Sequence, residues 1–317
     1  MKVLVTGAAG FIGMHCARRL LARGDEVVGV DNLSAYTSVE LKQDRLKQLP
    51  ANGFRFEQLD IADADSLERV FHSAGSQAVV HLAAQPGVRY SLENPAAYVQ
   101  SNLVGFANVL ECCRRHPPRH LVFASSSSVY GANPKLPWSE GDSVDHPASF
   151  YAATKKSNEL MAHVYSHLHR VRATGLRYFT VYGPWGRPDM SPMIFAHAIM
   201  EGRSIHVFNH GDMQRDFTCI DDVVEGTLRV LDKPAPYAIY NVGNQAPVPL
   251  LAYIAALESA LGKSARLEMK PMQPGDVKAT YADTRALREA VGFAPSTPLE
   301  TGIASFASWF KGYYGYR

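Results

Sequence analysis

Short apolar runs alternate with amphipathic segments along the first half of the chain. Apolar runs rich in β-branched residues predict strands, and apolar residues spaced by roughly three to four positions predict helices. We expect strands over residues 2–7, 26–31, 54–61, 78–84, 120–126 and 172–183, and helices over 11–24, 63–74, 94–115 and 149–169. Because strands that alternate with helices are typical of βαβ units, the pattern predicts an α/β protein with a Rossmann-type, doubly wound parallel sheet.

The regular alternation ends after Gly183, in a loop rich in proline and glycine, and the later elements are short and mixed. We therefore predict a first domain over residues 1–180 and a smaller mixed α/β lobe over 181–317 that binds the substrate. A helical segment within 216–240 is expected to return to the first domain.

Composition and charge narrow the class of protein. Of the 317 residues, 46% are hydrophobic and 20% are charged, which is ordinary for a soluble globular chain. The formal net charge of +2 comes without a basic block, so we expect no nucleic-acid partner. The sequence shows no membrane-length apolar run and no secretion signal, so we expect no membrane partner. The cysteines are Cys16, Cys112, Cys113 and Cys219, and their spacing is not that of metal ligands. We therefore expect free thiols in a reducing cytoplasm and no metal site.

The stretch "VTGAAGFIG" places three glycines between the first expected strand and the first expected helix. In a dinucleotide site, Gly7 would permit the tight turn, Gly10 would let the backbone approach a pyrophosphate, and Gly13 would let the helix pack closely on the strand. A glycine motif alone is a weak signal, but here an apolar strand precedes it and an amphipathic helix follows it. The first domain is therefore expected to bind a dinucleotide.

Acidic residues end the next two expected strands. Asp31 would accept hydrogen bonds from the ribose hydroxyls and repel a 2′-phosphate, and the next residue, Asn32, brings no arginine beside it, so the motif favours NAD over NADP. Asp60 and Ile61 end the third strand, where an adenine edge would sit. A plain turn aspartate at Asp60 is an alternative that the sequence supports almost equally well.

Tyr151 and Lys155 share one face of the expected helix over 149–169, because they are four residues apart. A tyrosine with a pKa of about 10 is a poor base at neutral pH. A lysine ammonium one turn away, together with the positive nicotinamide of NAD, would lower that pKa. Such a pair often reflects simple amphipathic packing, but its place after the fifth strand of a glycine-fingerprinted domain favours a catalytic role.

Four consecutive serines end the fifth expected strand, in "FASSSSVYG". The carboxyl end of a parallel strand faces the ligand crevice, and successive side chains alternate in direction. We therefore expect one serine to join Tyr151 and a substrate hydroxyl in a hydrogen-bond relay, and others to bind an anionic or polar substituent. Ser125 is expected only to satisfy neighbouring groups.

Motifs along nearly the whole chain resemble the extended short-chain dehydrogenase/reductase superfamily, and within it the nucleotide-sugar 4-epimerases. The motifs are "VTGAAGFIG", "VDNL", "HLAAQPGVRYS", "SNLVG", "SSSSVYG", "YAATKKSNE", "RDFTCIDDVVEG" and "QPGD". "GVRYSLENPAAYVQSNLVGF" and "YFTVYGPWGRPDMSPMIF" are most similar to UDP-glucuronate 4-epimerases. The resemblance implies an NAD-dependent isomerase that converts UDP-glucuronate to UDP-galacturonate by transient oxidation at C4, turning of the 4-keto sugar, and reduction from the other face.

The same resemblance assigns roles position by position. It implies that Ser126 is the catalytic hydroxyl, Tyr151 the base and Lys155 its partner. The implied NAD contacts are Gly7, Gly10, Phe11, Ile12, Gly13, Asp31, Asn32, Asp60, Ile61, Leu82, Ala83, Ala84, Gln85, Asn102, Tyr151, Lys155 and Phe179. The implied contacts to the nucleotide diphosphate and ribose are Arg215 and Asp276, and those to a hexuronate carboxylate are Ser127, Ser128, Thr180 and Arg187. Gln273 stands where some UDP-galactose epimerases carry an arginine, which puts the diphosphate contacts in doubt.

Other functions stay open at this point. A UDP-glucose 4-epimerase is the second enzyme that the motifs fit. A dehydratase or a UDP-glucuronate decarboxylase is disfavoured, since the related motifs carry an acidic residue where this chain has Ser127 and Ser128. An NAD-sensing regulatory protein typically loses the tyrosine or the lysine, and this chain keeps both. The resemblance also implies a homodimer formed by the helices around residues 102–112 and 151–167.

Overall fold

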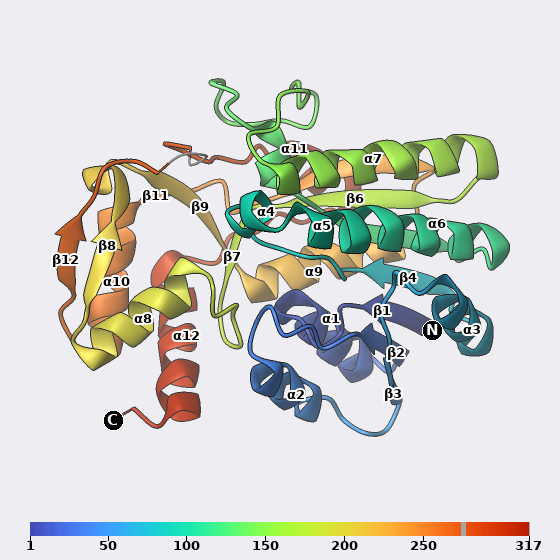
Figure 1. Ribbon diagram of the computed structural model, residues 1–317, viewed down its shortest axis with the longest axis horizontal. Coiled ribbons are helices and arrows are strands. Elements are labelled where there is room, and N and C mark those ends of the chain that lie inside the picture. Colours follow the sequence, from blue (N-terminus) through green and yellow to red (C-terminus); the bar gives the residue numbers. More distant parts are fainter. Residues whose placement is uncertain (274–276, 317) are drawn as a thin grey trace.

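The computed structural model describes residues 1–273 and 277–316, and its centre is a sheet of seven parallel strands. The strand order is β10-β6-β5-β4-β1-β2-β3. The bounds are β1 Lys2–Thr6, β2 Glu26–Asp31, β3 Phe54–Gln58, β4 Ala78–His81, β5 His120–Ser126, β6 Ala173–Tyr178 and β10 Tyr237–Val242. This arrangement confirms the predicted Rossmann-type α/β fold (Figure 1).

Helices cover both faces of this sheet, because successive strand residues point to opposite sides. Val3 and Val5 face a core shared with α1 and α9, whereas Leu4 faces a core shared with α3 and α6. The helices of the first face are α1 Phe11–Ala22, α2 Val39–Lys47, α9 Ile220–Asp232 and α11 Arg285–Val291. Those of the second face are α3 Ala64–Ala74, α6 Gly105–Arg115 and α7 Phe150–His169. Three of these helices begin at an expected type of cap, since Ser38, Asp63 and Ser149 each accept a hydrogen bond from a backbone N–H three residues on.

The remaining elements form a second lobe with a core of its own (Figure 1). Its strands are β7 Thr180–Tyr182, β8 Ser204–Val207, β9 Gln214–Cys219, β11 Pro247–Pro249 and β12 Arg266–Met269. They pair as β11-β9-β7 and β12-β8. The helices packed on them are α8 Ser191–Glu201, α10 Leu250–Leu261 and α12 Leu299–Tyr314.

The prediction of one continuous strand over 172–183 is wrong. It divides at Phe179 into β6, which pairs with β5 and β10, and β7, which pairs with β9. The backbone N–H of Phe179 still bonds to the carbonyl of Val242 at 3.0 Å, and the next residue, Thr180, already lies opposite Phe217. The chain therefore passes from one sheet to the other within one residue.

The segment after β9 returns to the first sheet. Helix α9 packs against α1, and β10 then takes the sheet edge beside β6. The sequence pattern did not predict β10 or α2. The division into 1–180 and 181–317 stays a prediction.

The helix expected over 94–115 is interrupted. Helix α5 (Pro95–Tyr98) runs into a π-helical turn, η1 (Val99–Val104), before α6 continues. A shorter helix, α4 (Tyr90–Glu93), precedes them, and single 3₁₀ turns cover η2 (Ser127–Tyr130) and η3 (Phe208–Gly211). None of the helices in the described part of the chain is both long and apolar enough to cross a membrane.

Candidate active site

A cavity of about 370 Å³ opens at the carboxyl ends of the parallel strands, where the fold class places ligands. Most residues singled out from the sequence line it together: Gly7, Gly10, Phe11, Ile12, Gly13, Asp31, Asn32, Asp60, Ile61, Leu82, Ala83, Ala84, Gln85, Ser126, Ser127, Ser128, Tyr151, Lys155, Phe179, Thr180 and Arg187. Asn102 and Arg215 lie outside this lining, and Asp276 falls outside the described residues.

The glycine turn at one end of the cavity leaves no room for side chains. Gly7 has a φ of +73°, and a Cβ there would lie 2.7 Å from the backbone N of Ala83. A Cβ on Gly13 would lie 1.9 Å from the carbonyl oxygen of Gly7. Such close approach of backbone to backbone is what a pyrophosphate cradle at a helix N-terminus needs, so this end of the cavity fits NAD.

The carboxylate of Asp31 lies where β2 ends, buried at the cavity wall. It accepts hydrogen bonds from the backbone N–H of Ala9 at 3.2 Å and of Leu33 at 2.9 Å. The Nζ of Lys42, on α2, lies 4.0 Å from the same carboxylate. Across the cavity rim, Asn32 Nδ2 donates to Asp60 at 2.9 Å. An acid at this place fits the ribose hydroxyls of NAD, and the lysine beside it is a neighbour that the sequence pattern did not reveal.

Asn102 acts on the cavity from behind. Its side chain accepts a bond from the backbone N–H of Gln85 at 2.7 Å, and its Nδ2 donates to the carbonyl of Gln85 at 3.1 Å and to Thr154 Oγ1 at 3.1 Å. It lies in the π-helical turn η1, a type of turn that often occurs at functional sites. Asn102 thus fixes the loop that carries Gln85 rather than lining the cavity itself.

Helix α7 carries Tyr151 and Lys155 to the centre of the cavity. The Nζ of Lys155 donates to the carbonyl of Ala124 at 2.9 Å, and burial lowers the pKa of Lys155 to about 8. Burial raises the pKa of Tyr151, and the positive charge of Arg187 and a hydrogen bond with Ser126 offset part of that increase. In the protein alone, desolvation therefore outweighs the nearby positive charge. The expected lowering of this pKa concerned the site with NAD bound, and it stays a prediction.

The four serines of the run take different directions. Ser125 Oγ donates to the buried Glu159 at 2.6 Å, and Glu159 is itself paired with Arg177. Ser126 Oγ accepts from the backbone N–H of Ser128 at 3.1 Å, which begins the turn η2. Ser127 and Ser128 are half-buried at the cavity wall. Their separate directions follow from the alternation of a strand and the turn that ends it.

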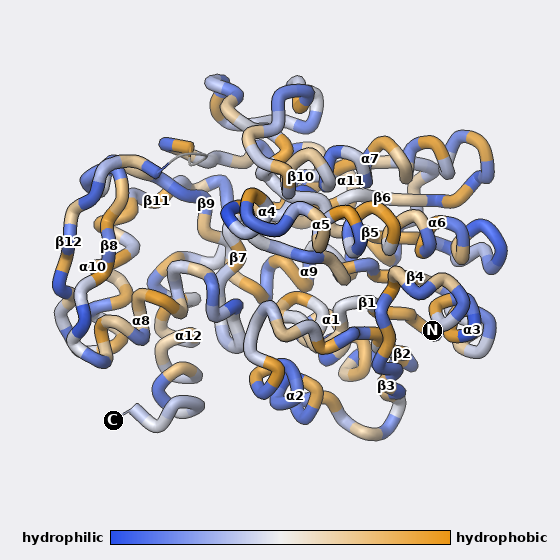
Figure 2. The backbone as a smooth tube through the Cα atoms, viewed as in Figure 1, coloured by the Kyte–Doolittle hydropathy of each residue, from blue (hydrophilic) through white to orange (hydrophobic). Residues whose placement is uncertain are grey.

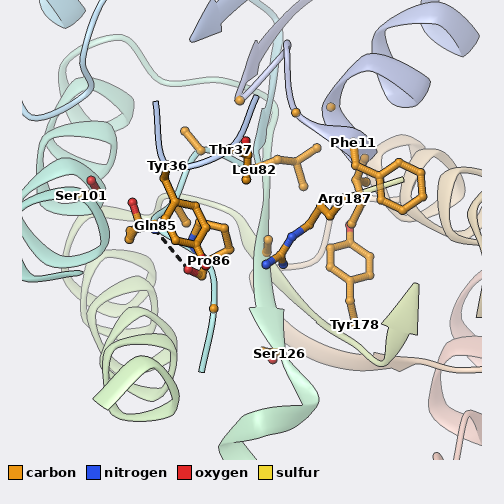
Figure 3. A pocket seen from close by; sticks show the side chains of 18 of the residues that line it. Phe11, Tyr36, Thr37, Leu82, Gln85, Pro86, Ser101, Ser126, Tyr178 and Arg187 are labelled. Carbon is orange, nitrogen blue, oxygen red and sulfur yellow. Dashed lines mark hydrogen bonds between the residues drawn. The ribbon is translucent and has the colours of Figure 1, made fainter. Parts of the chain in front are cut away.

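Arg187 extends its guanidinium into the cavity between Leu82 and Tyr178 (Figure 3). It does not stand alone there. Its Nε and Nη2 donate to the carboxylate of Asp189 at 3.0 and 2.6 Å, and the hydroxyl of Tyr36 donates to the same carboxylate at 3.2 Å. Sequence reasoning missed Asp189, although it is two positions from Arg187, and it missed Tyr36, which is 153 residues from Asp189 with no periodicity to relate them.

The loop that carries Arg187 is tied to two distant parts of the chain. Arg45, on α2, is buried and donates to the carbonyls of Trp185 and Gly186 at 2.8 and 2.9 Å. The ring of Trp185 packs against Trp309 and Tyr313 of α12, with centroids 5.3 and 5.0 Å apart. These contacts hold the loop between α2 of the first domain and α12 of the second lobe.

Comparisons with known proteins agree with this geometry. Residues 3–243 match the model of the NAD dependent epimerase/dehydratase family. A relative from Arabidopsis thaliana, UDP-glucuronate 4-epimerase 3, is 46% identical over an alignment of 331 positions, which spans 99% of this chain and 77% of the relative. UDP-glucuronic acid 4-epimerase from Bacillus cereus, solved with UDP-glucuronic acid and NAD, superimposes with a TM-score of 0.93 at 35% identity, covering 99% of this chain and 100% of the other. UDP-glucose 4-epimerase from Thermotoga maritima, solved with UDP-glucose, has a TM-score of 0.91 at 30% identity, with 99% and 100% covered.

Proposed function

Because this chain belongs to the NAD dependent epimerase/dehydratase family, we propose that it is an isomerase that converts UDP-glucuronate to UDP-galacturonate by inverting C4 of the sugar. One observation carries the choice of substrate. Three hydroxyl side chains, Ser127, Ser128 and Thr180, line the cavity together with Arg187, next to Tyr151. Hydroxyls and a guanidinium are the donors that suit a sugar carboxylate.

NAD, when bound, would supply the hydride acceptor for C4 and, in its reduced form, the hydride donor for the opposite face of the 4-keto sugar. The groups of this chain move and hold protons around that exchange. Tyr151 takes the proton of the 4-hydroxyl, with Ser126 in the same hydrogen-bond chain. Lys155, held to the carbonyl of Ala124, supplies positive charge 6.0 Å from the ring of Tyr151.

Substrate with a carboxylate at C5 poses a chemical difficulty. Once C4 is a ketone, the carboxylate is β to it and can leave as carbon dioxide when the C5–C6 bond stands perpendicular to the plane of the carbonyl. We propose that Ser127, Ser128, Thr180 and Arg187 hold the carboxylate out of that alignment. The matching motif of related decarboxylases carries a glutamate. This chain has the hydroxyls of Ser127 and Ser128 at that place, so it offers no acid that could protonate C5.

The nucleotide end is proposed to involve the second lobe. Arg215 lies on β9, and its Nη1 donates to the carbonyls of Gln214 and Lys278 at 2.8 and 3.2 Å. It would reach the diphosphate from that strand, together with Asp276, which lies outside the described residues. This end would stay bound while the 4-keto sugar turns.

A UDP-glucose 4-epimerase is the second candidate. The observation that favours it is the pairing of Arg187 with Asp189, because a neutralised guanidinium attracts an anionic sugar less strongly. The similar enzyme from Thermotoga maritima, with UDP-glucose bound, belongs to that class. The two candidates share every catalytic group and differ only in the substituent at C5.

We propose that two copies of the chain associate through α6 and α7. Leu160, Val164 and Leu168 are exposed on one side of α7, and Val104, beside α6, is exposed as well. Figure 2 shows hydrophobic residues along α7. Apolar side chains at this spacing form one stripe that a second copy would cover. Sedimentation of the protein should give a dimer, and Val164→Glu should give a monomer, whereas Glu201→Gln, on α8 of the other lobe, should leave the dimer intact.

The function is tested by incubating the purified protein with UDP-glucuronate and with UDP-glucose in separate reactions and identifying the products. UDP-galacturonate from the first, with little carbon dioxide and no NADH that grows in step with product, is the expected result. A UDP-pentose as the main product, or turnover of UDP-glucose alone, would exclude the proposal.

A further inference from the structure

Arg187 lines the cavity, and it is paired with Asp189, which lies two positions further along the chain and is not itself part of the lining. Burial alone would raise the pKa of Asp189, but Arg187 more than offsets this, and the pKa of the carboxyl falls below its usual value. Asp189 is therefore ionised at neutral pH. Tyr36 adds a third hydrogen bond to the same carboxylate, from the loop after β2.

The contact engages one side of the guanidinium. Asp189 takes one N–H of Nε and one of Nη2, and a guanidinium carries five N–H donors in one plane. The three that remain point away from Asp189, and Nη1 and Nη2 together form the edge that binds a second carboxylate. Since Arg187 lines the cavity and its charge is felt by Tyr151, this edge is within reach of the sugar.

We propose that Asp189 is a specificity-determining residue: by offsetting the charge of Arg187, it limits how strongly the cleft prefers an anionic sugar over a neutral one. The inference rests on the proposed function, in which the sugar carboxylate lies beside Arg187. Without Asp189, an uncompensated positive charge would face the carboxylate in a partly dehydrated site, where charges interact strongly.

A limited attraction between Arg187 and the sugar carboxylate favours turnover in this reaction. The 4-keto sugar must turn over before it is reduced, so its carboxylate has to leave one set of partners and meet another. A guanidinium with its full charge would hold the first pose too well. Binding that stabilises one ground state without stabilising the transition state slows turnover.

The test compares Asp189→Asn with Asp189→Glu. Each change is placed in a Tyr151→Phe background loaded with NAD, so that UDP-glucuronate and UDP-glucose can be titrated by calorimetry without turnover. UDP-glucose carries the same diphosphate and lacks the carboxylate, so the ratio of the two dissociation constants isolates the effect on the anion. Asp189→Asn should tighten UDP-glucuronate about tenfold and leave UDP-glucose within about twofold. Asp189→Glu keeps the charge and should leave the ratio near that of the parent.

Glu201→Gln is the matched control. Glu201 also accepts hydrogen bonds from an arginine two residues away, Arg203, and from a tyrosine, Tyr316, but Arg203, unlike Arg187, does not line the cavity. The same change in net charge there should leave the ratio unchanged. In the active enzyme, Asp189→Asn should lower both KM and kcat for UDP-glucuronate.

Weaker binding of UDP-glucuronate in Asp189→Asn would overturn the inference, because it would make Asp189 only a support for Arg187. An equal shift for both sugars, or the same shift in Asp189→Glu, would overturn it as well. The binding ratio does not need turnover. It therefore decides the role of Asp189 even if the wild-type protein fails to convert UDP-glucuronate, an outcome that would remove the proposed function alone.

Discussion

The two ends of the cleft are built from different materials. At the glycine turn, where the pyrophosphate of the cofactor would lie, the wall is backbone, and an added Cβ at Gly7 or Gly13 would overlap main-chain atoms. At the sugar end the contacts come from side chains: hydroxyls on a strand end and charges on the loop of Arg187. Backbone geometry cannot change without changing the fold, whereas hydroxyls and charges can be exchanged at little cost to it. The comparison teaches that the cofactor is tied to the fold and the substrate is tied to a few side chains.

The largest effect is expected from a substitution at the cofactor end of the cleft. We expect Gly13→Ala to abolish NAD binding and to lower the free energy of unfolding by at least about 3 kcal/mol, because the new Cβ would lie 1.9 Å from the carbonyl oxygen of Gly7. Cofactor content after purification and denaturant unfolding measure the two effects. Gly312→Ala meets nothing within 4 Å in α12 and should raise stability by roughly 0.5–1 kcal/mol. A stable, NAD-loaded Gly13→Ala protein would contradict the comparison.

The sugar end should lose chemistry without losing the cofactor. Tyr151→Phe is expected to lower kcat by about 10²–10⁴-fold, the usual contribution of a general base, while NAD content and fold stay intact. Tyr165→Phe, fourteen residues further along the same helix and outside the cavity lining, removes a hydroxyl that bonds Glu111 at 3.3 Å and should leave kcat unchanged. More than a tenth of the wild-type rate in Tyr151→Phe would take this residue out of the base role.

Lys155 joins the two ends, and its burial should show as a pH dependence of stability. Its pKa is about 8 in the folded protein and about 10.4 in an unfolded chain, so between these values the unfolded chain binds more protons. Stability from this residue therefore rises with pH from about 8 to about 10, by at most about 3 kcal/mol. The measurement is the difference in unfolding free energy between wild type and Lys155→Met across that range, which cancels the ionisation of the buried cysteines. A difference that stays flat would show that folding does not lower the pKa of Lys155.

The smallest effect should appear at the hydroxyls. Thr180→Ala is expected to lower kcat/KM for UDP-glucuronate about tenfold and hardly that for UDP-glucose, because a hydrogen bond to a charged group contributes roughly 1.5–3 kcal/mol. A rise in the pentose by-product should accompany it, as it should in Ser128→Ala. Ser157→Ala, which removes a hydroxyl bonded to the carbonyl of Ala153 in its own helix, is the control. Equal losses for both sugars would assign Thr180 to the sugar ring or the cofactor instead of the carboxylate.

The same contrast explains how far the sequence could predict the molecule. The buried strands of the parallel sheet are nearly continuous apolar runs, so they stand out in the pattern. The glycine turn and the Tyr151–Lys155 pair are local motifs whose spacing carries their meaning. β10 was missed because it is a half-buried edge strand, and its place was set by the return of α9.

The sequence pattern could not predict where the chain changes the strand with which it pairs. Residues on either side of Phe179 are equally strand-like. Nothing in the local sequence shows that β6 pairs with β5 and β10 whereas β7 pairs with β9. The same holds at the cavity wall. Lys42 and Tyr36 are distant in sequence from their partners, and only the packed fold brings Lys42 to Asp31 and Tyr36 to Asp189.

The packing of the Trp185 ring determines when, during synthesis of the chain, the sugar end of the cleft can form. Trp185 has a φ of +63°, a conformation that a bulky residue adopts only when its surroundings hold it there. Part of that support is Trp309 and Tyr313, near the carboxyl end of the chain. A growing polypeptide can form the glycine turn long before these residues leave the ribosome, but it cannot yet seat the loop of Arg187. Chains cut short before α12 would then hold the cofactor's half of the cleft without a finished place for the sugar.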